Sequence, residues 1–466
     1  MSNYYLRPAA LTLIVLVLGC TNQSDTDLGA TVARKVILII GDGMDDQQIT
    51  IARNYLVGSQ GQLSIDTMPF RGAVQVQAVA EDDPSKPVYV ADSANSATTM
   101  AGGVLTSRGR VGTTAQTDED IVTIMELASA AGMGTGIVTT ASITDATPAS
   151  FIAHINQRYC QRSIDMVRMN ETFPQFSTDC SRDYKANGGR GSISEQIAAS
   201  QVNIILGGGA DHFNDFIEGS FEITVLEAAR SNGFEVIWNR SELTKLPNNK
   251  KIMGLFSPGT MPVKYRGVDG GEARLIAREA GQVKWPEPFI CEANPDFENL
   301  PTLAEMARVA LDHLDNHAGF MLMIESASID KESHYRRPCG HIGELSQLND
   351  AVRIALDYGE SHPETLILVT ADHGSAAHII SQTSSLAPQN YATPGRFARV
   401  LTPEGSIMGI NYASNDSPLW DEHSGVQVPI FASGPGANDL PTFIRQADIF
   451  KISASHLGLL DTGLRK

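Results

Sequence analysis

The chain has 466 residues, of which 42% are hydrophobic and 19% charged. This length is enough for one large core or two domains, and the composition is that of a globular protein. Acidic residues outnumber basic ones by 53 to 35, and the net charge of -18 argues against nucleic acid as a partner, because phosphate backbones bind positive surfaces. It does not exclude a small anionic substrate, because binding depends on the local field at the site.

The first residues have the features of an export signal. Arg7 precedes an apolar run, LTLIVLVLGC, that is short for a membrane span but suits the core of a secretory signal. Its end, VLGC, resembles the lipobox of bacterial lipoproteins, in which the cysteine, here Cys20, is lipidated; cleavage of an ordinary signal peptide nearby is the alternative. We expect a signal peptide over 1–19, a polar tether over 20–33 and a periplasmic protein that contacts the membrane only through a lipid on Cys20.

Beyond the tether, aliphatic runs alternate with helical patterns. Runs of this kind are typical of buried parallel strands. They are KVILIIG (35–41), GIVTT (136–140), VNIILGG (202–208), GFMLMIE (319–325), TLILVTAD (365–372) and VPIFASG (428–434). Helices are predicted at 123–132, at 301–317 with Pro301 in its first turn, and at 343–360.

The alternation predicts an α/β fold with one doubly wound, mostly parallel central sheet and helices on both of its faces. We expect residues 34–466 to form a single catalytic domain. Two irregular stretches, near 159–191 and 383–418, are interpreted as surface insertions of that domain.

Four cysteines lie beyond Cys20. An even number in an oxidising compartment predicts two disulfides, and the lack of a C-x-x-C pair argues against a zinc ribbon. Three pairings are open; we favour Cys160–Cys180 with Cys291–Cys339 because this pairing closes the shortest loops.

Carboxylates and imidazoles recur just after the predicted strands, where doubly wound sheets bind ligands. Taken singly, an Asp after a strand is usually a helix cap or a turn residue. Asp330 and His334, however, are four residues apart and would share one face of a helical turn, as two ligands of one ion do. The whole set offers ligands suited to zinc and to magnesium. Its members are Asp42, Asp145, Thr147, Glu325, Asp330, His334, Asp372, His373 and His423.

The stretch VYVADSANSATTMAGG, residues 88–103, places Ser93 at the start of a predicted helix, with Asp92 just before it. The two could simply cap that helix. A serine hydroxyl becomes a nucleophile when a metal ion or a helix N-terminus lowers its pKa, and two metal ions about 4 Å apart can clamp the oxygens of a phosphoryl transfer. Beside the metal-ligand set, we interpret Ser93 as a nucleophile.

These motifs resemble those of the alkaline phosphatases. They fall in the order found in that family and span most of the mature chain, with the weakest match over 211–292. The motifs are GDGM at Asp42, VADSANSAT around Ser93, TDATPASFIAHINQR over 144–158, IESASIDKESH over 324–334, TADHG at Asp372–His373 and EHSG at His423.

The resemblance implies catalytic roles for four residues. Ser93 would form a covalent phosphoserine, and Arg158 would hold two phosphate oxygens, a geometry that only arginine offers. Asp92 would orient Arg158, and Lys331 would reach the phosphate through water.

The resemblance also implies two zinc ions, one magnesium ion and a homodimer. The pair of Asp145 and Lys331 resembles the magnesium-using bacterial form of the family, whose two-disulfide pattern also fits Cys160 and Cys339. The implied ligands are Asp330, His334 and His423 for one zinc ion, Asp42, Asp372 and His373 for the other, and Asp42, Thr147, Glu325 and, through water, Asp145 for magnesium.

The sequence therefore predicts an exported alkaline phosphatase that hydrolyses small phosphate monoesters. A sulfatase would need a C/S-x-P-x-R motif, which is missing around Ser93, and a phosphomutase would need a large domain between Ser93 and Asp145. A phosphodiesterase on the same metal scaffold stays open. A non-catalytic phosphate- or metal-binding lipoprotein is disfavoured because it would not need Ser93, Arg158 and Thr147 together.

Overall fold

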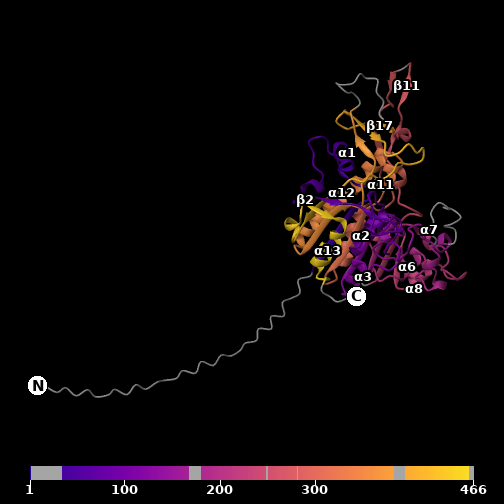
Figure 1. Ribbon diagram of the computed structural model, residues 1–466, viewed down its shortest axis with the longest axis vertical. Helices are drawn as coiled ribbons and strands as arrows, with labels where there is room; N and C mark the ends of the chain where they lie inside the picture. Colours follow the sequence, from indigo (N-terminus) through magenta and orange to yellow (C-terminus); the bar gives the residue numbers. More distant parts are fainter. Residues whose placement is uncertain (2–33, 167–179, 248–249, 281, 382–393, 461–466) are drawn as a thin grey trace. The chain divides into compact units, whose positions relative to one another are not determined.

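The computed structural model describes Met1 and residues 34–166, 180–247, 250–280, 282–381 and 394–460 (Figure 1). The expected signal peptide and tether, apart from Met1, lie outside these residues. Within the described ranges, no helix has the length and apolar character needed to cross a membrane.

A ten-stranded sheet forms the core of the domain, in the order β20-β2-β19-β15-β1-β14-β5-β6-β8-β7. From β15 to β7 every pair is parallel, so the sheet is mostly parallel, as predicted. The strands at its centre are buried along their whole length and mostly apolar, because both faces are covered. The strands are β1 (Lys35–Gly41), β2 (Phe70–Gln75), β5 (Gly134–Ser142), β6 (Ile204–Gly208), β7 (Phe234–Ile237), β8 (Lys251–Leu255), β14 (Phe320–Ser326), β15 (Thr365–Ala371), β19 (Val428–Ser433) and β20 (Phe443–Arg445).

One predicted strand runs in the opposite direction. The run VPIFASG forms β19, which pairs antiparallel with β15 on one side and with β2 on the other. The expectation of a parallel strand was therefore wrong here. A continuous apolar run reports burial on both faces, but strand direction depends on the connection that precedes the strand.

Two groups of helices cover the sheet. In one group α12 (Pro338–Ser361) packs against α1 (Asp46–Leu56), α10 (Leu303–Leu314) and α11 (Ser328–His334); in the other α13 (Gln446–Leu457) packs against α2 (Ser93–Gly102) and α3 (Ile124–Ala130). Together with the sheet they form the predicted α/β fold.

Two helix starts differ from the prediction. Thr302 caps α10 with Glu305 in a capping box, so Pro301 lies before the helix and not in its first turn. The long helix α12 begins at Pro338, five residues before Gly343. Gly340 and Gly343 hide the helical pattern in the sequence, because glycine is a poor helix former.

A second, four-stranded antiparallel sheet has the order β10-β17-β18-β16. Two of its strands, β17 (Arg396–Leu401) and β18 (Ile407–Tyr412), lie in the stretch 383–418 that we expected to be irregular. Residues 382–393 fall outside the described part. The other strands are β10 (Arg274–Leu275) and β16 (Ala377–Ile379).

The four cysteines pair as Cys160–Cys180 and Cys291–Cys339. The first bond closes the stretch 159–191, of which residues 167–179 are not among those described. The second joins β13 (Cys291–Ala293) to the first turn of α12.

Candidate active site

Two acidic residues leave the central sheet side by side. Asp42 follows β1 and Asp372 follows β15, its parallel neighbour. Asp372 Oδ1 accepts hydrogen bonds from the backbone N–H groups of Gly43 (2.9 Å) and His373 (2.8 Å). Gly43 has a φ of 66°, and a Cβ there would meet the Asp330 Cβ at 2.8 Å, so only glycine lets β1 end this close to α11. His373 Nε2 lies 3.4 Å from Asp42 Oδ1 and 3.3 Å from Asp372 Oδ2.

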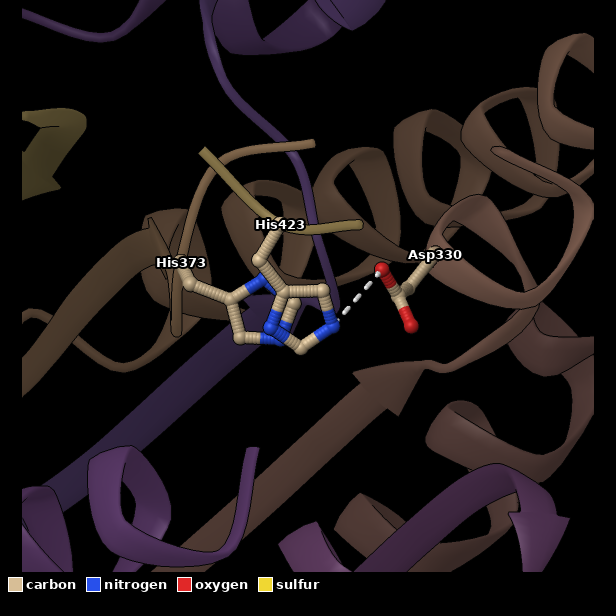
Figure 2. Close-up of side chains that lie close together, drawn as sticks. All are labelled: Asp330, His373 and His423. Atoms are coloured by element: carbon tan, nitrogen blue, oxygen red, sulfur yellow. Dashed lines mark ion pairs between the residues drawn. The ribbon is translucent and has the colours of Figure 1, made fainter. Parts of the chain in front are cut away.

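Helix α11 and the segment before β19 contribute three further ligand-type side chains. Asp330 Oδ2 lies 2.9 Å from His334 Nε2, as the i, i+4 spacing predicted. His423 places its Nε2 3.1 Å from that of His334 and 3.7 Å from Asp330 Oδ1. Its ring stacks on the ring of His373 with centroids 3.6 Å apart, which joins the two sets of residues (Figure 2).

The ligand-type atoms form two groups in which all atoms lie within 4.8 Å of one another. These groups are Asp42, Asp372 and His373, and Asp330, His373 and His423. The first is the set expected for one zinc ion. In the second, His373 stands where the expected set had His334, although His334 contacts both Asp330 and His423. His373 therefore belongs to both groups.

All three histidines use the same ring nitrogen for support. In each ring Nδ1 faces a backbone carbonyl, which can only accept, so Nδ1 carries the proton and the Nε2 lone pair is directed into the cluster. The pairs are His334 with Asp421, His423 with Ala91 at 2.9 Å, and His373 with Gly374 at 3.3 Å. Imidazoles held in this way have the tautomer and orientation of metal ligands.

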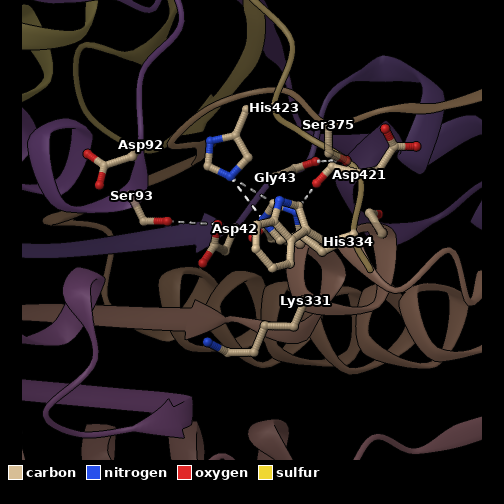
Figure 3. Close-up of polar contacts among 12 residues, drawn as sticks. Asp42, Gly43, Asp92, Ser93, Lys331, His334, Ser375, Asp421 and His423 are labelled. Atoms are coloured by element: carbon tan, nitrogen blue, oxygen red, sulfur yellow. Dashed lines mark hydrogen bonds and ion pairs between the residues drawn. The ribbon is translucent and has the colours of Figure 1, made fainter. Parts of the chain in front are cut away.

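Ser93 lies against this cluster as the first residue of α2. Asp92 is the N-cap of the helix and forms a capping box with Asn95. The Ser93 hydroxyl is buried and lies 3.4 Å from Asp42 Oδ1 (Figure 3). It lies 3.2 Å from His373 Nε2. The helix N-terminus favours ionisation of this oxygen, and a cation held by the neighbouring ligand-type groups would favour it further.

Arg158 lies between two carboxylates at the side of Ser93. Its Nη1 is 3.3 Å from Asp92 Oδ2 and its Nη2 is 3.2 Å from Asp145 Oδ1; Lys331 pairs with the other oxygen of Asp145. Burial acts to raise the pKa of both carboxyl groups, but the neighbouring cations outweigh it and hold each pKa below its ordinary value. Burial likewise acts to lower the pKa of Arg158 and of Lys331, and the carboxylates raise it instead. The site thus keeps two positive charges for an anionic ligand.

The third expected ligand set is built around Glu325, near the end of β14. Thr139, opposite it on β5, donates a hydrogen bond to Glu325 Oε2. Burial and then the charge of Asp145 raise the pKa of Glu325 above its ordinary value. The buried hydroxyl of Thr147 lies near enough to lower this pKa, yet outside hydrogen-bond geometry. Thr147 therefore has an oxygen available for another partner.

The electrostatics of the cluster fit bound cations. Burial, and then the charges of Asp372, Asp330 and Glu325, raise the pKa of Asp42 well above its ordinary value. Two buried carboxylate oxygens, Asp330 Oδ1 and Asp372 Oδ2, have no hydrogen-bond partner among the described residues. Buried negative charge without enough donors is compensated by metal ions in such sites, and the nitrogen and oxygen donors here match zinc and magnesium.

All thirteen residues that the sequence singled out lie in this region, but several supporting residues were missed. Thr139 supports Glu325, and the carbonyls of Ala91 and Asp421 orient His423 and His334. No sequence signal could reveal which backbone carbonyl holds a ligand histidine, since any residue type supplies a carbonyl.

Comparison with known proteins shows which families the chain is similar to. The family model described as alkaline phosphatase matches residues 33–417. A streptomycin-6-phosphate phosphatase of Streptomyces griseus is 39% identical over 463 residues, 96% of each chain. An alkaline phosphatase of Escherichia coli K12 is 36% identical over 92% of this chain and 86% of its own. Among solved structures, the alkaline phosphatase of the Antarctic bacterium TAB5 superposes with a TM-score of 0.65 at 21% identity, covering 92% of this chain and 99% of its own, and supports the fold.

Proposed function

The chain belongs to the alkaline phosphatase family and is a phosphatase, and on this premise we propose that it hydrolyses phosphate monoesters through a covalent phosphoserine at Ser93. The observation that carries the proposal is the position of the Ser93 hydroxyl. It lies at a helix N-terminus, within 3.4 Å of Asp42 and 3.2 Å of His373, while Arg158 pairs with the preceding residue, Asp92. The proposed nucleophile is thus linked to the proposed phosphate-binding guanidinium through Asp92, its neighbour in the chain.

Two zinc ions and one magnesium ion complete the proposed site. When bound, these ions lower the pKa of the serine hydroxyl and of water and neutralise the phosphate oxygens. The proposed ligands are Asp330, His334 and His423 for one zinc ion, Asp42, Asp372 and His373 for the other, and Asp42, Thr147 and Glu325, with Asp145 through water, for magnesium.

The side chains bind and position the ester. The fork of N–H groups on Arg158 holds two phosphate oxygens, and Asp92 and Asp145 fix the plane of that fork. Lys331, paired with Asp145, adds a second positive charge on the same side. Because these contacts exist without a ligand, the cost of orienting the phosphate is reduced.

The reaction then runs in two displacements at phosphorus. In the first, Ser93 Oγ forms a bond to phosphorus as the bond to the leaving oxygen breaks; the hydroxyl proton goes to solvent and the leaving oxygen takes one up to become an alcohol. In the second, a water oxygen bonds to phosphorus and the bond to Ser93 Oγ breaks. Inorganic phosphate leaves, and Ser93 regains its proton.

One relative suggests a narrower substrate class. The Streptomyces griseus enzyme named for streptomycin 6-phosphate matches 96% of both chains, whereas the Escherichia coli enzyme is covered to 86%. A phosphorylated aminoglycoside is therefore the second candidate substrate. The rates of hydrolysis of an aminoglycoside phosphate and of p-nitrophenyl phosphate distinguish the two cases. A specialised enzyme would prefer the aminoglycoside phosphate, whereas a broad one would hydrolyse both.

Export and a homodimer complete the proposal. The leader over 1–19 and two disulfides support a periplasmic location, where such bonds persist. Attachment to the membrane would require a lipid on Cys20.

The test uses the purified protein loaded with zinc and magnesium. Ser93→Ala should lower the turnover of p-nitrophenyl phosphate by several orders of magnitude while the metal content stays at the wild-type value. Ser96→Ala, one turn further along the same buried helix, is the matched control and should keep activity. In wild-type protein quenched with acid during turnover, mass spectrometry should find phosphate on Ser93.

A phosphodiesterase gives a different result in the same assays. Bis(p-nitrophenyl) phosphate would then be hydrolysed faster than the monoester. Equal loss of metal and activity in Ser93→Ala would show that the serine is structural.

A further inference from the structure

Arg336 has an unusual backbone and side-chain position just after the metal-ligand helix. Helix α11 ends at His334, and Arg336 follows its C-cap, Tyr335, with a φ of 59°. This left-handed position is usually filled by glycine, because a Cβ is disfavoured there. Arg336 is also only 3% exposed. A buried charge on a strained backbone persists where the surrounding structure uses its side chain.

In the described part of the chain, the hydrogen bonds of the Arg336 side chain all go to one segment. Its Nη2 donates to the carbonyls of Trp420 (2.7 Å) and Ser417 (2.9 Å), and it lies 3.4 Å from Asn415 Oδ1. Its Nε lies 3.4 Å from Asp421 Oδ2. All four partners belong to the segment between β18 and β19 that carries His423.

Asp421 organises the same segment from within. Its Oδ1 accepts hydrogen bonds from the backbone N–H of Ser414 (3.1 Å) and of Glu422 (3.2 Å). Its own N–H donates to the carbonyl of His334 at 2.9 Å, and its carbonyl accepts from His334 Nδ1. Asp421 therefore joins the segment to His334 of α11, and the segment supplies the next proposed ligand, His423, two residues later.

We propose that Arg336 is a positioning residue that holds the His423 segment on α11 and so fixes the geometry of one metal site. The proposal rests on the zinc sites of the proposed function. Residues 413–427 form no helix or strand apart from one isolated bridge at Ser424, so nothing regular in the described chain fixes the position of His423. Beside the Ala91 carbonyl and the Ser424 bridge, the guanidinium constrains this segment by binding three of its oxygens and pairing with a fourth group, Asp421.

The proposal separates the two zinc sites. The Asp330, His334 and His423 site depends on the Arg336 contacts, because His423 comes from the segment that Arg336 holds. The Asp42 and Asp372 site depends on β1 and β15, whose ends are fixed by the sheet. Loss of the guanidinium should therefore weaken one ion and spare the other.

The experiment measures zinc retained per chain, for the full protein, against a graded series of chelator concentrations. Arg336→Gly removes the guanidinium and places glycine at a φ of 59°, which relieves the backbone strain and offsets part of the cost of leaving Asp421 unpaired. Arg336→Lys keeps the charge without the fork. We expect Arg336→Gly to bind one of two zinc ions about 10- to 100-fold more weakly, with Arg336→Lys in between. Excess zinc should restore turnover of the variants.

Arg337→Lys is the matched control. This neighbouring arginine is half exposed; its guanidinium lies 3.7 Å from Glu332 and over the ring of Tyr335. Neither group belongs to the His423 segment, so this variant should retain zinc as the wild type does. Far-ultraviolet circular dichroism of the metal-free proteins should be the same for all four.

Two outcomes would overturn this inference but leave the proposed function standing. In the first, Arg336→Gly retains zinc as the wild type does. In the second, Arg336→Gly loses both ions in parallel and its metal-free form unfolds at a lower temperature, which is the result expected of a purely structural role. A wild-type protein that binds no zinc would overturn the proposed function and this inference together.

Discussion

At the scale of single residues, Arg158 is oriented before any phosphate binds. Asp92 and Asp145 already hold its two terminal nitrogens at 3.3 Å and 3.2 Å. Arg158→Lys keeps the positive charge but loses the planar fork, so inorganic phosphate should bind about tenfold more weakly. The inhibition constant of phosphate for p-nitrophenyl phosphate hydrolysis measures the change.

Arg162→Lys provides the comparison for this variant. Arg162 pairs with Asp165 and Asp215, outside the contacts of Ser93, and its replacement should leave phosphate binding unchanged. Equal weakening in both variants would mean that general charge, and not the fork of Arg158, binds the phosphate.

The sequence reveals residues whose chemistry is local and misses those whose role depends on distant partners. Asp330 and His334 could be paired from their spacing, because four residues make one helical turn. Arg336 carried no such signal, since its partner Asp421 is 85 residues away and its left-handed backbone is not encoded in the residue type. The same limit applies to Thr139, which becomes a partner of Glu325 only through the pairing of β5 with β14.

At the scale of elements, His154 connects three segments that lie outside the candidate site. Its Nε2 is 3.0 Å from Glu126 of α3, its Nδ1 is 2.9 Å from the carbonyl of Gly112, and its backbone N–H donates to Gln196 of α6 (Ile193–Ala199). Burial acts to lower the pKa of His154, but Glu126 and the Gly112 carbonyl raise it above its ordinary value. A raised histidine pKa stabilises the fold fully below the unfolded value, and this stabilisation is lost as pH rises through the folded value.

Replacement of His154 should therefore cost more stability in acid than in base. We expect His154→Gln to lower the free energy of unfolding at both pH values, by about 1 kcal/mol more at pH 6 than at pH 9. The difference should not be larger, because Glu126 is 38% exposed and solvent screens its charge. Urea unfolding at the two pH values gives both differences. Glu126→Gln keeps the cap of α3 and removes the charge, so it should reduce the same pH dependence; an equal cost at both pH values would contradict the assignment.

The sheet shows which properties of an element can be read from composition. Its apolar runs predicted buried strands because burial on both faces selects aliphatic residues along the whole strand. The reversed direction of β19 could not be read in this way, because it follows from the antiparallel strands and the long segment that precede it. That same segment carries His423. The predicted strand whose direction differs from the prediction, β19, therefore follows a loop that bears a proposed metal ligand.

At the scale of the whole domain, the proposed metal ions would connect elements that are far apart in sequence. Their ligands follow β1, lie in α11, follow β15 and precede β19, and buried carboxylates such as Asp42 repel one another in the absence of a cation. Ions that bind only the folded chain stabilise it by an amount that grows with the logarithm of their concentration, about 4 kcal/mol at a thousandfold excess over the dissociation constant. For a chain of this size, removal of the ions should lower the unfolding temperature by several degrees.

Calorimetry of the chelated protein and of samples with graded zinc and magnesium measures this shift. Ser93→Ala should show the same dependence on metal as the wild type, because the serine is not needed to assemble the carboxylates and imidazoles. Arg336→Gly should need more zinc to reach the same unfolding temperature, because His423 is then held less firmly. An unfolding temperature that does not change with chelator would mean that packing alone holds these residues together, since a cation that joins four separate elements must stabilise the folded chain.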